Sequence, residues 1–161
     1  MAISTQQIAL PSQFSVLAYR DKKFLDNPAN LPAGWTVKDD SVSPPFAAFA
    51  FQNDTTGEVV IAYRGTDGLS DGLADLAIAS GSWHPQFQQG MDFVVEVQAG
   101  RTIFPQGTDP STLLVTGHSL SGAIAQVAAQ AYGLHGSTID PGAALRSTSA
   151  ASTVTCAKRV T

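Results

Sequence analysis

Cysteine is almost absent from this sequence: Cys156 is the only one in 161 residues. A single cysteine cannot form a disulfide within the chain, and it excludes metal sites built from several cysteines. The chain also has no uninterrupted run of about 18 apolar residues, the signature of a membrane-spanning helix. We therefore expect no disulfide, no metal, no cofactor and no membrane span.

Charge is also scarce. Charged residues make up 14% of the chain against 43% hydrophobic residues, and 9 Lys and Arg face 13 Asp and Glu, for a net charge of −4. No basic cluster is present, so nucleic acid is not an expected partner. The first residues, Met1 to Gln7, lack a basic stretch followed by an apolar one, so no signal peptide is visible and a cytoplasmic protein is the default expectation.

The most informative stretch runs from Leu113 to Ala123, where a short apolar run ends in Gly117 and Ser119 follows two residues later. A helical pattern of apolar residues begins at once, at Leu120, Ile124, Val127 and Ala131. Strand, sharp turn and helix form the context of a Gly-x-Ser nucleophile elbow. Ser119 is thus a candidate nucleophile, with the N–H of Leu120 facing the same space. The alternative is that Ser119 only caps the helix.

One position departs from the usual Gly-x-Ser-x-Gly pattern of such elbows. Ser121 occupies the last glycine position, and Gly122 comes one residue later. A serine adds a Cβ and a hydroxyl where the helix crosses close to the strand. We therefore expect a modest packing cost at Ser121.

Strand and helix patterns alternate along the chain. This alternation predicts an α/β fold, a mostly parallel sheet with helices on both faces. The expected helices are Thr5 to Tyr19, Phe87 to about Gly100, and Leu120 to Gly133 or Gly136; the expected strands are Phe46 to Phe51, Glu58 to Arg64, the run ending at Gly117, and Ser137 to Asp140. Asp26 to Pro32 is predicted to be loop, and Trp35 to Asp40 is left open. Leu145 to Thr161 shows no period, which is typical of a loosely docked tail.

Two separate stretches resemble one family. Val115-Thr116-Gly117-His118-Ser119-Leu120 resembles the nucleophile elbow of the class 3 lipases, the α/β-hydrolases typified by fungal triacylglycerol lipases. Val60-Ile61-Ala62-Tyr63-Arg64-Gly65-Thr66 is similar to the strand and the Arg-Gly-Ser/Thr oxyanion motif of that family, and Ala74-Asp75-Leu76 to the segment after it. The resemblance covers roughly Ile8 to Ala144. It implies an α/β-hydrolase-like domain over residues 1–144 whose C-terminal strands are missing, followed by a tail at 145–161.

The resemblance also implies residue roles. Ser119 is then the nucleophile, and Thr66 together with the N–H of Leu120 forms the oxyanion hole. The stretch from Asp67 to Leu76 corresponds to a lid or its remnant. Arg64 is expected to anchor loops, since acyl transfer needs no arginine.

The base of the catalytic triad has no clear counterpart here. In this family an aspartate and a histidine follow the serine in that order, whereas His135 precedes Asp140 in this chain. A helix of about 20 Å separates Ser119 from His135, and Asp140 fits an Asp-Pro turn. His84 is a candidate base, with a structural loop histidine as the alternative. A partner chain is another possible source of the base.

These observations predict a carboxylic ester hydrolase, an esterase or lipase that forms an acyl-enzyme at Ser119 with an ester or lipid substrate. The alternative is a non-catalytic lipase-like remnant that binds acyl ligands or a protein partner. A shortened sheet would leave an open edge at Ser137 to Asp140, and open edges favour pairing with another chain. We therefore expect a homo-oligomer.

Overall fold

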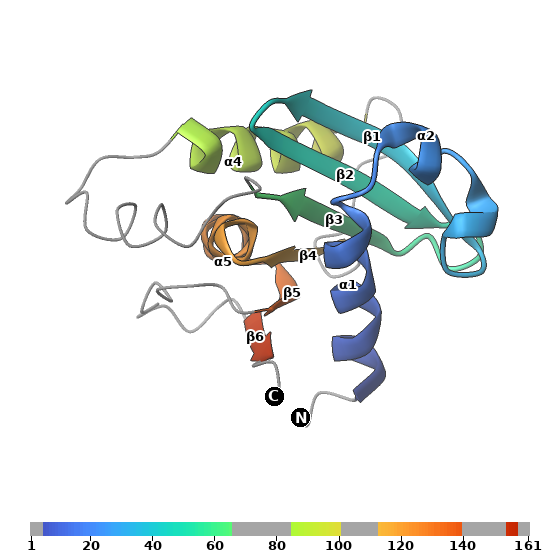
Figure 1. The fold of residues 1–161 in the computed structure, drawn as a ribbon. Helices are drawn as coiled ribbons and strands as arrows, with labels where there is room; N and C mark the ends of the chain where they lie inside the picture. The colour runs from blue at the N-terminus through green and yellow to red at the C-terminus, as the bar shows by residue number, and fades with distance from the viewer. Residues whose placement is uncertain (1–4, 66–84, 101–112, 140–153, 158–161) are drawn as a thin grey trace.

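A six-stranded sheet organises the protein (Figure 1). The computed structural model describes residues 5–65, 85–100, 113–139 and 154–157. The strands lie in the order of the sequence: β1 Trp35–Ser43, β2 Phe46–Asn53, β3 Val59–Arg64, β4 Leu113–His118, β5 His135–Ile139 and β6 Val154–Ala157. The helices are α1 Thr5–Leu17, α2 Lys22–Leu25, the 3₁₀ helix η1 Pro28–Asn30, α4 Pro85–Ala99 and α5 Leu120–Tyr132.

The sheet is mixed, and β2 alone runs against the other strands. It pairs antiparallel with both β1 and β3, whereas β3 to β6 are parallel to their neighbours. Short links explain the antiparallel part, because a tight turn can join only antiparallel strands. Pro44 and Pro45 separate β1 from β2, and a turn in which Asn53 accepts N–H bonds from Thr55 and Thr56 at 2.9 Å each leads to β3.

Helices cover both faces of the sheet, as predicted. α1 lies on one face, and α4 and α5 lie on the other (Figure 1). Successive residues of β3 point to opposite faces of the sheet: Ile61 and Tyr63 face α4 and α5, while Val60 and Ala62 face α1. Because both faces are covered, the strand reads as a continuous apolar run.

The layer of α4 and α5 is fixed by a close contact at Gly90. A Cβ added there would lie 2.4 Å from Cγ2 of Ile124, so only glycine lets the two helices approach this closely. The fully buried Tyr63 donates its hydroxyl to the C=O of Gly90 at 3.0 Å. Burial raises the pKa of Tyr63, so the hydroxyl remains a neutral donor.

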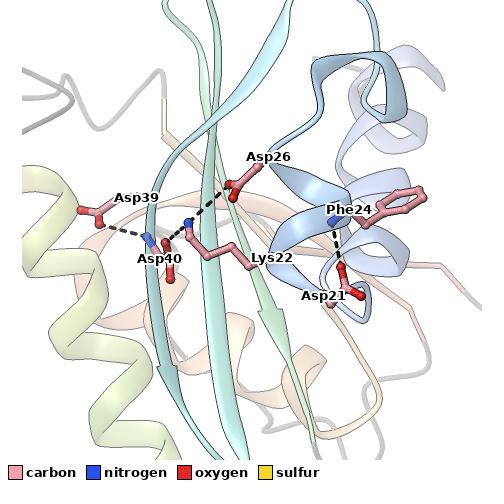
Figure 2. Close-up of polar contacts among 6 residues, drawn as sticks. All are labelled: Asp21, Lys22, Phe24, Asp26, Asp39 and Asp40. Atoms are coloured by element: carbon pink, nitrogen blue, oxygen red, sulfur yellow. Dashed lines mark hydrogen bonds and ion pairs between the residues drawn. The ribbon is translucent and has the colours of Figure 1, made fainter.

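Polar contacts fasten α2 to the edge strand β1 (Figure 2). Asp21 caps α2 by accepting the N–H of Phe24 at 2.7 Å. Lys22 pairs with Asp40 of β1 at 2.7 Å and with Asp26 at 3.4 Å, and the hydrogen bond with Asp40 raises the pKa of Lys22. The Lys22 side chain is half exposed, so these pairs orient α2 more than they stabilise the fold.

The structure changes several expectations about local elements. The stretch left open at Trp35 is a long strand, β1, and the predicted loop after Asp26 contains η1. The open edge expected at β5 is wrong, because β6 pairs with it from Gly136 opposite Val154 to Ile139 opposite Ala157. A four-residue strand in a polar stretch has too short a pattern to be recognised from sequence.

The proposed division into a domain over residues 1–144 and a tail over residues 145–161 stays a prediction.

None of the helices in the described ranges is long and apolar enough to cross a membrane.

Two buried hydroxyls on neighbouring strands provide a test of this core. Tyr63 donates a hydrogen bond, whereas Oγ1 of the buried Thr116 has no partner among the described residues. Tyr63→Phe should lower the free energy of unfolding by about 1 kcal/mol, and Thr116→Val should leave it unchanged or raise it. Urea denaturation of the two variants measures both effects. An equal loss in Thr116→Val would show that its hydroxyl has a partner.

Candidate active site

The turn between β4 and α5 has an unusual backbone at Ser119. Its φ is 59° and its ψ is −126°, and it is the only non-glycine residue with positive φ in the described part of the chain. Such a conformation costs on the order of 1–3 kcal/mol and persists only where the surroundings enforce it. This strained strand–turn–helix junction, here called the elbow, resembles the geometry of a nucleophile elbow.

Backbone hydrogen bonds hold Ser119 on both sides. Its N–H donates to the C=O of Ile139 in β5 at 3.0 Å, and its C=O accepts from the N–H groups of Gly122 and Ala123 at 2.9 and 3.3 Å. The Ser119 side chain makes no capping hydrogen bond to α5. Ser119 therefore occupies the N-cap position of α5 without the side-chain bond that favours serine there.

Gly117 is the residue that makes the sharp turn possible. A Cβ added there would lie 2.2 Å from the O and 2.3 Å from the C of Ser121, and 2.7 Å from the N of Gly122. The first turn of α5 thus passes directly over the end of β4. Any side chain at position 117 would push the helix away and release the elbow.

Ser121 does more than add bulk at this crossing. It is fully buried, and its hydroxyl accepts the N–H of His118 at 2.9 Å and donates to the C=O of His118 at 2.7 Å. The expected packing cost is therefore accompanied by two hydrogen bonds. Sequence inspection missed this role because a pattern comparison registers only the lost glycine.

The end of β3 meets the start of α5. A Cβ added at Gly65 would lie 3.2 Å from the N of Ser121, 3.4 Å from Cβ of Leu120 and 3.6 Å from Oη of Tyr19. The two motifs that resemble the same family therefore come together in space. Thr66 follows Gly65 directly but lies outside the described residues, as do the expected lid segment 67–76, His84 and Asp140.

Tyr19 is a further residue at this junction that the sequence did not single out. Its hydroxyl donates to the C=O of His118 at 3.3 Å, and its ring meets the His118 ring edge-on with centroids 6.3 Å apart. This contact holds the His118 side chain against the segment that follows α1. A tyrosine two residues beyond a helix offers no recognisable sequence signal for such a role.

The described histidines do not supply a base for Ser119. His135 lies opposite Leu114 at the far end of the parallel pair, four residues before the Ile139 that pairs with His118, roughly 13 Å along the strand. This confirms that His135 is remote from the elbow. Within the described residues, neither His118 nor His135 hydrogen-bonds to Ser119, and no group of three His, Cys, Asp or Glu could hold a metal ion.

Comparison with known proteins finds a structural likeness. No family model and no curated protein matches the sequence. Lipase II from Rhizopus niveus matches with a TM-score of 0.60 at 18% identity, and a mutant form of MDLA from Penicillium cyclopium matches with a TM-score of 0.54 at 23% identity. The chain has a fungal lipase-like fold. Each match covers 86% of this chain and 63% of the other, so the chain spans less than two thirds of either protein.

Strain at the elbow can be measured by comparing two substitutions at one position. Ser119→Gly removes the penalty of a positive φ, whereas Ser119→Ala keeps it. We expect Ser119→Gly to be the more stable variant by about 1 kcal/mol, the reverse of the usual order, although glycine gains entropy in the unfolded chain. Thermal or urea denaturation measures the difference. A more stable alanine variant would contradict a strained elbow.

Proposed function

We propose that this protein is a carboxylic ester hydrolase, an esterase or lipase that acts through an acyl-enzyme on Ser119. The positive φ of Ser119 between β4 and α5 is the observation that carries the proposal. In this reaction Oγ attacks the ester carbonyl carbon while a base takes the hydroxyl proton. Collapse of the tetrahedral intermediate breaks the ester C–O bond while the base returns its proton to the leaving oxygen, which departs as the alcohol. Water then hydrolyses the acyl-enzyme to the carboxylic acid and free Ser119.

The oxyanion of that intermediate needs donors from two segments. The N–H of Leu120 is the first of α5, where the helix itself offers no carbonyl to accept it and the helix dipole favours negative charge. Thr66 is the proposed second donor. The position of Gly65 beside Leu120 supports this role, because Thr66 follows Gly65 directly in the sequence.

A non-catalytic acyl-binding protein with a lipase-like fold is the second candidate. It is favoured by one observation: in the described ranges, the side chains of His118 and His135 make no hydrogen bond to Ser119. The two candidates differ in a simple outcome, since only the enzyme turns over an ester.

Ester hydrolysis and covalent labelling test the proposal directly. The wild-type protein should hydrolyse a p-nitrophenyl ester and gain one phosphonate adduct in intact-mass spectra, because the elbow presents Ser119 to an electrophile. Ser119→Ala should abolish both. Ser43→Ala is the control, since Ser43 is an exposed serine at the end of β1. A folded wild-type protein with neither turnover nor adduct favours the non-catalytic candidate.

We also propose that the chain self-associates. β6 is an edge strand of four residues, and its outer edge has no partner among the described strands.

His84 is the proposed general base. Removal of a general base typically lowers the rate about 10²–10⁴-fold, so His84→Ala should lower kcat by that order.

Mixing two inactive variants shows whether the base acts within one chain or between chains. In a dimer with a shared site, an equal mixture of Ser119→Ala and His84→Ala should regain about a quarter of the wild-type activity, because half of the dimers are mixed and each has one intact site. No recovery would place serine and base in the same chain. A single monomeric species in sedimentation at micromolar concentration would contradict self-association.

A further inference from the structure

The last residue of β4 has lost the strand partner on one side. The β3–β4 pairing ends at Tyr63 opposite Gly117. The N–H of Ser119 bonds to β5, so the N–H and C=O of His118, one residue earlier, point to the β3 edge. In this register the β3 partner for the His118 C=O would be the N–H of Gly65, and β3 ends one residue earlier, at Arg64. Buried backbone groups without a partner are costly, so something must replace the missing strand.

The Ser121 hydroxyl replaces it. One oxygen accepts the N–H of His118 and donates to its C=O, at 2.9 and 2.7 Å, and the Tyr19 hydroxyl adds a longer bond to the same C=O at 3.3 Å. Ser121 and His118 stand on either side of the elbow. The two bonds therefore close a short ring around Ser119, the residue with the strained backbone.

We propose that Ser121 is a positioning residue for the nucleophile Ser119 and for the N–H of Leu120. This inference rests on the proposed function. The Ser121 hydroxyl already uses its proton and a lone pair on His118, so it does not take part in the chemistry itself. Its role is to keep the elbow strained and to let β3 leave the sheet at Gly65, beside the first turn of α5.

A serine at this position thus acts differently from the glycine of the usual pattern. Glycine would leave room for the crossing but would bring no partner for the backbone of His118. The serine fills that space and satisfies both backbone groups. Without its hydroxyl, the segment from His118 to Leu120 can relax, which moves the nucleophile and the oxyanion donor together.

Rates on folded protein test this role. Ser121→Ala should lower the rate of phosphonate labelling and kcat for a p-nitrophenyl ester by about 10- to 100-fold, since a displacement of about 1 Å can cost 10²-fold. KM should change little. Ser121→Thr keeps the hydroxyl and should recover most of the rate, and Thr116→Val, which removes a buried hydroxyl from β4, should keep the wild-type rate.

A purely structural role predicts another result. Ser121→Ala would then melt at a lower temperature but label Ser119 at the wild-type rate when measured well below its melting point, and this outcome would overturn the inference. If Ser121→Ala does not fold, Ser121→Cys gives the same comparison, because its sulfur fills the space with weaker and longer bonds.

Hydrogen exchange separates this inference from the proposed function. If the wild-type protein does not react with the phosphonate, the proposed function fails. Exchange of the amides of His118 and Ser119 still decides the positioning role: it should accelerate in Ser121→Ala but not in Thr116→Val. Unchanged exchange at both amides would overturn the inference without reference to any reaction.

Discussion

The close crossing of α5 over the end of β4 is the constraint on which the rest of the site depends. Backbone atoms of Ser121 and Gly122 occupy the space in which a Cβ of Gly117 would lie. The chain can pass from strand to helix so abruptly only if the intervening residue takes a positive φ, and that residue is Ser119. Ser119 keeps this strained conformation because β4 and α5, packed on either side of it, allow no other.

The same crossing organises the neighbouring strand. β3 pairs with β4 only as far as Tyr63, and the chain then passes Gly65 beside Leu120. Hydroxyl groups from Ser121 and Tyr19 take over the backbone partners that β3 gives up. The end of the sheet is therefore a place where side chains substitute for a strand.

Several features could be predicted from residues alone because their causes are local. The apolar run of β3 and the stripe of α5 have unambiguous periods, and Gly133, with φ 65°, ends α5 as expected of a glycine cap. Local sequence patterns did not predict the elements whose structure depends on residues far away in the sequence. β1 is a strand with mixed burial and a bulge between Val37 and Asp39, so it shows no clean alternation, and the four residues of β6 are ordered by pairing with β5.

The sequence by itself determined the lipase-like order of strand, elbow and helix, and the glycine at 117 on which the turn depends. Tertiary structure decided what surrounds that turn: the meeting of Gly65 with Leu120, the two bonds of Ser121 to His118, and the contact of Tyr19 with His118. The physical reason is the separation along the sequence of the residues that interact. A turn or a helix is specified by residues a few positions apart, whereas partly or fully buried polar groups find partners wherever packing brings them, 99 positions along the chain in the case of Tyr19.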